Sequence, residues 1–205
     1  MIELFVSAFV TFLVVIDPPG CAPIFASVTK GATPQHRRAM AFRSVGIAAG
    51  ILIFFALLGR DLLHALGISL NSFRIAGGLL LFLIAVDMVF EKRTERREHR
   101  AEEVVEDKQE DVSVFPMAIP MIAGPGSIAS VMLQMARSDT WTEKFVVWGA
   151  LGATLVLTLL CLLLAGPLMR LLGHKMEAMI TRLLGVILAA LAVQFVIDGI
   201  RRSFF

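Results

Sequence analysis

The stretch Asp17-Pro18-Pro19-Gly20-Cys21-Ala22-Pro23 interrupts an apolar segment that runs from about Leu4 to Val28. A second stretch, Pro120-Met121-Ile122-Ala123-Gly124-Pro125-Gly126-Ser127, interrupts another apolar segment, and its Pro-Gly pair follows the first by 106 positions. Proline removes a backbone donor and glycine permits strained backbone, so each stretch predicts a break in a helix. In a bilayer, irregular backbone is tolerated only where it is buried in protein or lines a cavity.

The composition places the chain among integral membrane proteins. It has 205 residues, of which 57% are apolar, and a mean hydropathy of +0.80. The formal net charge of +2 is too small to indicate a nucleic-acid partner. The two cysteines, Cys21 and Cys161, both lie in apolar segments, so a disulfide framework is not expected.

Six membrane spans are expected, because a bilayer core requires about 20 apolar residues in a helix. They are placed at about residues 4–28, 44–59, 73–90, 112–136, 145–169 and 178–197. The first stretch has no basic flank, so it is interpreted as a retained helix rather than a signal peptide. Alternate loops carry thirteen Lys and Arg residues against six on the other side, which predicts that both termini face outward.

The two halves of the chain resemble each other. Besides the two Pro-Gly pairs, Arg74-Ile75-Ala76-Gly77 matches Arg182-Leu183-Leu184-Gly185 at an offset of 108. Each half holds three spans, and an odd number inverts the second copy, so residues 1–90 and 112–205 are predicted to be inverted repeats. Residues 91–111 are expected to form a solvated cytoplasmic linker of mixed charge with no chemical role.

Three stretches together resemble the MarC family of bacterial inner-membrane proteins: residues 16–25, residues 116–126 and residues 192–200. The resemblance covers nearly the whole chain. It implies an inner-membrane protein of six helices in two inverted repeats, related to transporters of small neutral amino acids. The family usually has Asn where this chain has Cys21, a departure that bears on substrate specificity.

The breaks also supply the candidate binding groups. A broken helix exposes N–H groups and the positive end of its dipole, which bind anions such as a carboxylate, while unwound carbonyls suit a cation. A zwitterionic amino acid offers both charges, so we expect alternating-access transport of a small neutral solute such as glycine or alanine, with H⁺ or Na⁺ coupling open. The substrate-binding candidates are Asp17, Gly20, Cys21, Gly124, Gly126 and Ser127.

Each polar candidate has a structural alternative. Asp17 directly before a proline is also a good helix N-cap, so its carboxylate can serve capping alone. Ser127 can back-bond to its own helix, and Gln134 can bond across a helix interface or face a pore. Arg74 and Arg182, near predicted span ends, are expected to reach the interface by snorkelling.

No motif for catalysis is present, since the four histidines lie in loops or near span ends and no paired intramembrane aspartates occur. We therefore expect no enzyme activity, catalytic residue, metal or cofactor. A membrane accessory protein that does not transport remains the alternative function. The expected partners are a small-molecule substrate and membrane lipid, not nucleic acid, and homo-oligomerisation stays open.

Overall fold

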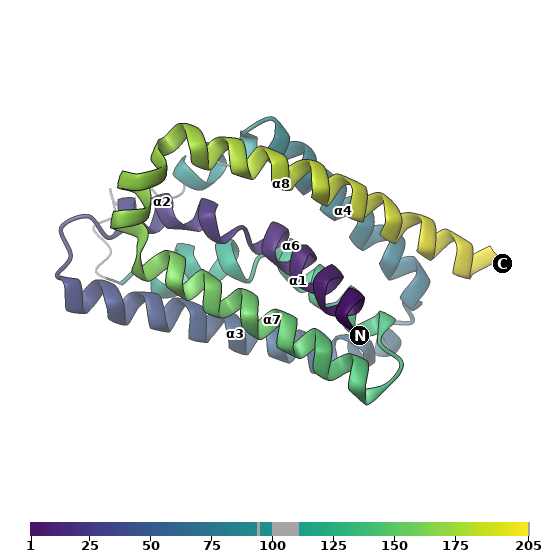
Figure 1. Cartoon of the computed structure of the whole chain (residues 1–205). Coiled ribbons are helices and arrows are strands. Elements are labelled where there is room, and N and C mark those ends of the chain that lie inside the picture. The colour runs from purple at the N-terminus through teal and green to yellow at the C-terminus, as the bar shows by residue number, and fades with distance from the viewer. Residues whose placement is uncertain (94, 100–110, 205) are drawn as a thin grey trace.

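The computed structural model describes residues 1–93, 95–99 and 111–204, and every regular element in these ranges is a helix (Figure 1). Five helical segments are long and apolar enough to cross a membrane, or six when one bent pair counts as a span. The all-α membrane class is confirmed. The elements are α1 (Ile2–Ile16), α2 (Pro18–Val28), α3 (Pro34–Ala65), α4 (Leu70–Val89), η1 (Ser113–Ile122), α6 (Pro125–Arg137), α7 (Trp141–Leu163) and α8 (Ala165–Phe204).

Side-chain caps fix the starts of three long helices. Thr33 and Ser69 accept hydrogen bonds from backbone N–H groups three residues ahead, at the first turns of α3 and α4. Thr140 and Glu143 form a reciprocal capping box at the start of α7. Each cap satisfies a donor that the first turn of a helix leaves without a partner.

The helices are longer than the predicted spans, and one boundary was misplaced. Helix α3 begins at Pro34, ten residues before the expected span, and α7 ends at Leu163, so Met169 belongs to α8. Residues 170–177, expected as a loop, are helical as well. Hydropathy locates the part of a helix that suits hydrocarbon, whereas caps and prolines such as Pro167 decide where the backbone hydrogen bonding starts and stops.

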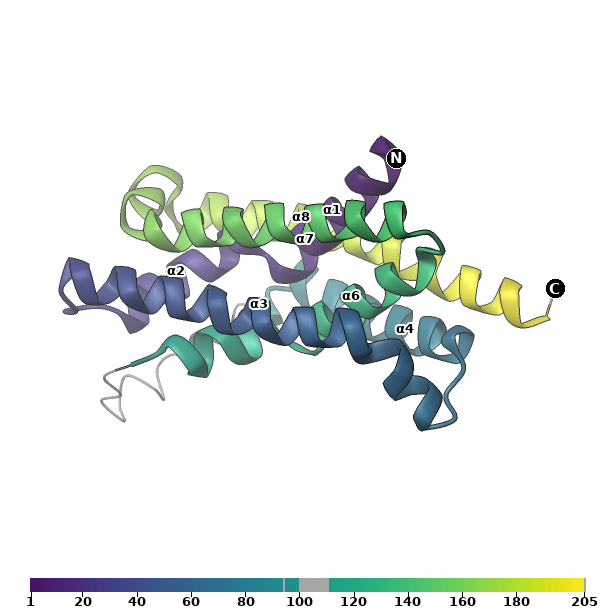
Figure 2. The same ribbon diagram turned by 90° about the horizontal axis from the view of Figure 1, so that it is seen from below.

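Helix α1 lies at the centre of the bundle. Its residues Phe12 and Ile16 are buried in one apolar cluster with α2, α3, η1 and α7. Its residues Val14 and Val15 are buried in a second cluster with α4, α6 and α8. Figure 1 shows α1 and α2 running between the α4–α8 pair and the α3–α7 pair, and Figures 1 and 2 show both termini toward one end of the bundle.

Two polar residues predicted from the sequence lie at helix interfaces. The Gln134 side-chain amide donates to the Thr11 hydroxyl at 3.1 Å, joining α6 to α1, and both residues are buried. The interface alternative for Gln134 is therefore confirmed. Arg74 is buried rather than snorkelled, because its guanidinium donates to Asn71 Oδ1 and to the Ala136 carbonyl at the end of α6.

Glycine residues allow α4 and α8 to pack closely. A Cβ atom built on Gly78 of α4 would lie 2.8 Å from the Ala192 carbonyl oxygen of α8. A Cβ atom built on Gly199 of α8 would lie 3.1 Å from the Asn71 carbonyl oxygen of α4. Small residues at these positions let the two backbones approach, which is a principal source of helix association in lipid.

Replacing Gly78 with alanine is expected to lower the free energy of unfolding by about 1–3 kcal/mol, because the methyl group overlaps α8 backbone. The matched control is Gly50→Ala in α3, where nothing lies within 4 Å of the added atom. That control should be neutral or slightly stabilising, since alanine is the better helix former. Thermal unfolding of both variants in detergent tests this, and equal melting temperatures would contradict close α4–α8 packing.

Candidate functional site

The first break is centred on Asp17. Its backbone has the left-handed values φ 58° and ψ 64°, which end α1, and its N–H still donates to the Leu13 carbonyl at 2.9 Å. Pro18 then opens α2, and the Asp17 side chain caps it by accepting the Gly20 N–H at 3.1 Å. The capping role of Asp17 is therefore confirmed, and it occupies one of its two carboxylate oxygens.

Gly20 is required by this cap. A Cβ atom at position 20 would lie 2.2 Å from Asp17 Oδ2, so any larger residue would push the carboxylate away. The sequence led us to expect an exposed Gly20 N–H, but Asp17 already occupies that group. Cys21 is completely buried one turn into α2, and its thiol lies 3.5 Å from the Ile16 carbonyl oxygen.

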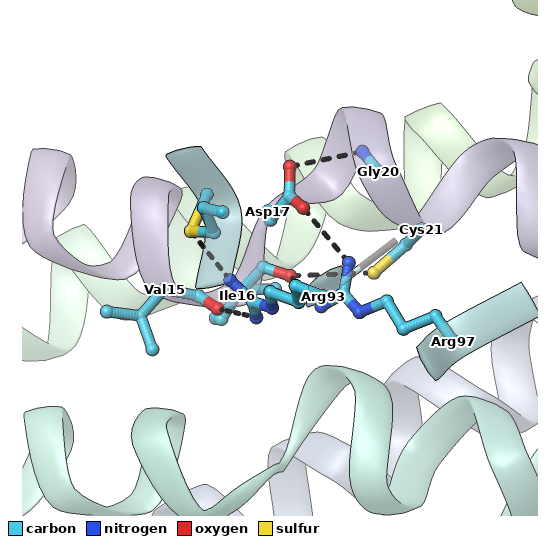
Figure 3. A network of polar contacts seen from close by, with 8 residues as sticks. Val15, Ile16, Asp17, Gly20, Cys21, Arg93 and Arg97 are labelled. Atoms are coloured by element: carbon cyan, nitrogen blue, oxygen red, sulfur yellow. Dashed lines mark hydrogen bonds and ion pairs between the residues drawn. The ribbon is translucent and has the colours of Figure 1, made fainter. Parts of the chain in front are cut away.

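Two arginines from the charged linker occupy the remaining polar groups of this break (Figure 3). We call residues 91–93 and 95–99 the linker segment. Arg97 donates to Asp17 Oδ2 at 3.0 Å and to the Ile16 carbonyl at 3.4 Å. Arg93 donates to the Val15 carbonyl at 2.6 Å. Arg97 is 7% exposed and Asp17 1%, so this is a buried ion pair.

The linker segment therefore contributes side chains to this break, and the expectation of a solvated linker was wrong for Arg97, which is 7% exposed. Its start is set by Glu91, which follows α4 with a left-handed φ of 62°, and helical turns follow at residues 92–93 and 95–99. Arg93 and Arg97 are four residues apart, which places them on one face of a helix. That spacing was the available signal, but the mixed charge of the segment obscured it.

The Arg93 guanidinium stays protonated at neutral pH. Burial, together with the like charge of Arg97, lowers the pKa of the Arg93 guanidinium to about 10. The Arg93 guanidinium also lies against the sulfur of Met88 at 3.0 Å. Arg96, on another face of the segment, pairs with Asp87 near the end of α4.

The second break separates η1 from α6, which meet at an angle of 51°. A Cβ atom on Gly124 would lie 2.3 Å from the Pro120 carbonyl oxygen, so only glycine fits this turn. Gly124 is the N-cap of α6 and offers no side-chain cap. The N–H groups of Gly126 and Ser127 consequently have no acceptor within the part of the chain that the structure describes.

A cavity of about 290 Å³ lies beside the second break. Gly124, Gly126 and Ser127 line it from α6, Val15 from α1, and the three linker arginines from the opposite wall. A Cβ atom built on Gly126 would lie 2.5 Å from Ile84 Cδ1 and 3.2 Å from Val15 Cγ1, so the second break packs closely against α4 and the end of α1. Asp17, Gly20 and Cys21 do not line the cavity themselves; Arg97 connects Asp17 to it.

The polar character of the cavity is cationic. The guanidinium groups of Arg93, Arg96 and Arg97 face two carboxylates, Asp17 and Asp87, leaving one positive charge in excess. Ser127 is 2% exposed, and no hydrogen bond of its hydroxyl occurs among the described residues. The cavity thus combines free N–H groups, a hydroxyl and cationic side chains in an apolar enclosure. Within the same residues, no cluster of three or more His, Cys, Asp or Glu could hold a metal.

The chain was compared with known proteins. Residues 2–204 match the family described as MarC family integral membrane protein. The chain is 37% identical over 200 residues to the UPF0056 membrane protein MJ1677 of Methanocaldococcus jannaschii, covering 98% of this chain and 97% of that relative. It is 33% identical over 201 residues to the UPF0056 inner membrane protein YhgN of Escherichia coli, covering 96% and 95%. No solved structure matches. The resemblance seen in the sequence is confirmed, and the chain belongs to the MarC family of integral membrane proteins.

Proposed function

We propose that this protein is a secondary transporter of a small neutral solute, with an amino acid such as glycine or alanine as the favoured substrate class. The observation that carries this proposal is the 290 Å³ cavity beside the second Pro-Gly break, which the Arg97–Asp17 ion pair links to the first break. Transport sites built from broken helices lie at such positions. The proposal includes two inverted three-helix repeats, an inner-membrane location and no enzyme activity.

The α6 end of the cavity suits the carboxylate of an amino acid. The N–H groups of Gly126 and Ser127 lie at the positive end of a 13-residue helix, and the Ser127 hydroxyl stands beside them. A helix N-terminus stabilises an anion through these donors and through the dipole. The excess positive charge of the linker arginines adds to the same preference.

The α1 end suits the amino group. The Asp17 carboxylate and the carbonyls of Val15 and Ile16 are three oxygen acceptors that converge on bound guanidinium groups. An ammonium group, or Na⁺, needs the same kind of acceptor. In this conformation the protein's own arginines hold that place, so a substrate cation would have to displace Arg97 from Asp17.

This competition supplies a gate for alternating access. With Arg97 on Asp17 the amine side of the site is closed, and withdrawal of the linker segment opens it. The alternative function, a membrane accessory protein, treats the Arg97–Asp17 pair as a permanent structural lock. The two functions differ in whether a ligand can stabilise the folded protein and in whether the linker segment opens.

The first test is thermal unfolding of the purified protein with glycine, alanine or serine, with and without Na⁺ and at two pH values. A ligand that binds only the folded state raises the free energy of unfolding by about 2.7 kcal/mol when its concentration is a hundredfold above Kd. We expect a selective rise in melting temperature with one amino acid, and its loss in Asp17→Asn. A folded protein that no amino acid stabilises would favour the accessory function.

Asp17→Asn leaves Arg97 without its buried partner, and breaking such a pair costs about 3–5 kcal/mol. The double variant Asp17→Asn/Arg97→Gln removes both charges together and controls for this loss of stability. It should fold better than the single variant and still fail to respond to the amino acid. A normal ligand response in the double variant would limit Asp17 to its capping role.

The second test measures whether the linker segment covers the site. Cys21 lies beside the Arg97 guanidinium and is completely buried, so its alkylation rate reports opening (Figure 3). In a Cys161→Ala background, Arg97→Gln should raise the alkylation rate of Cys21 about tenfold or more, since tenfold needs only about 1.4 kcal/mol. The matched control Arg96→Gln removes the same charge from an exposed position and should leave the rate unchanged. Equal Cys21 alkylation rates in the Arg97→Gln and Arg96→Gln variants would contradict the gate.

A further inference from the structure

A second hollow, of about 580 Å³, lies away from the two breaks, where several helices end. Arg60 comes from the last turns of α3, Arg74 from the start of α4, and Arg202 from the end of α8. Asn71 and Asp139 complete its polar lining. Three arginines that are far apart in the sequence therefore converge on one place, although they are among only six basic residues predicted for this side of the membrane.

The hollow has more positive than negative charge. It holds three guanidinium groups and a single carboxylate, that of Asp139. Among the described residues, no carboxylate lies within ion-pair distance of Arg60, Arg74 or Arg202, whereas Arg137 nearby is paired with Asp198. Cationic groups held together without counterions repel one another, so an anion bound between them would relieve that repulsion.

Arg74 gives the clearest indication of a ligand. It is 4% exposed, and two of its nitrogens are bonded, one to Asn71 Oδ1 at 3.2 Å and one to the Ala136 carbonyl at 2.9 Å. Its Nε–H is buried without any acceptor. Leaving a charged donor unsatisfied is costly, and the guanidinium fork matches the oxygens of a phosphate or carboxylate.

A tryptophan and a lysine lie next to this hollow. Trp141 is 74% exposed, and the Lys144 ammonium lies 4.8 Å from the centre of its ring. Both residues line a neighbouring hollow that shares Arg60 with the first. Tryptophan gathers where the hydrocarbon core meets the headgroups, which favours a lipid headgroup as one source of an anion for this hollow.

We propose that the hollow formed by Arg60, Arg74 and Arg202 binds a phosphate oxyanion, supplied either by the headgroup of an anionic lipid or by soluble phosphate. Arg74 contributes its guanidinium charge from the wall of the hollow, and the exposed arginines at positions 60 and 202 supply further donors to the oxyanion. This site is separate from the cavity at the breaks and does not depend on amino acid transport.

The test compares the two sources of phosphate on the full-length protein. Thermal unfolding is measured in detergent with inorganic phosphate against chloride at equal ionic strength. It is then measured in nanodiscs of phosphatidylcholine with and without phosphatidylglycerol. We expect a higher melting temperature with inorganic phosphate if the ligand is soluble, and only with phosphatidylglycerol if the ligand is a headgroup. No rise in either arm would overturn the proposal.

Variants locate the binding groups. Arg74→Gln should weaken binding of the stabilising probe about tenfold or more, because a charge-assisted hydrogen bond and its charge are lost. The double variant Arg60→Gln/Arg202→Gln should also weaken binding of the stabilising probe. Because these two side chains are exposed, this variant tests the site even if Arg74→Gln does not fold. Arg201→Gln is the matched control, since Arg201 is exposed and does not line the hollow. Equal weakening in the control would show a diffuse charge effect and overturn the site.

Discussion

A carboxylate buried among apolar helices must be neutralised, and the neutralisation of Asp17 is the constraint on which the rest of the site depends. Burying an unpaired charge costs several kcal/mol, so the partner has to be brought to it. The chain supplies two partners, the Gly20 N–H from the following turn and the Arg97 guanidinium from about 80 residues away. The cap is local and the ion pair is distant, so one residue fixes both a helix break and the position of the linker.

Several features of the site follow from this single pairing. Gly20 must lack a side chain because the carboxylate folds over it, and Gly126 must lack one because Val15 and Ile84 approach it from the other side. The linker segment has to enter the bundle for Arg97 to reach Asp17, and Arg93 then binds the Val15 carbonyl that the end of α1 leaves free. The result is a cavity with backbone donors on one wall and guanidinium groups on the other.

The fold class and the two breaks could be predicted from the sequence, because apolar length and Pro-Gly chemistry are local properties. The same reasoning found Asp17 as a cap, since Asp before Pro at a helix start is a local pattern. It failed for Arg93 and Arg97, because a charged stretch gives no sign of whether it faces water or a buried carboxylate. It also failed for Arg74, whose contact with the Ala136 carbonyl is set by how α4 meets α6. The inverted repeats, their boundaries and the outward termini remain predictions.

The glycine contacts between α4 and α8 bear on how the site could move. The backbones of the two helices approach closely at Gly78 and Gly199, and such close packing resists sliding of one helix past the other. The linker segment starts at Glu91, directly after α4, and Glu91 is paired with Arg182 of α8. The position of Arg93 and Arg97 is therefore tied to the α4–α8 pair. A shift of the α4–α8 pair along its axis by one helical turn, about 5.4 Å, would move both guanidinium groups out of hydrogen-bond range of the Val15 carbonyl and the Asp17 carboxylate together.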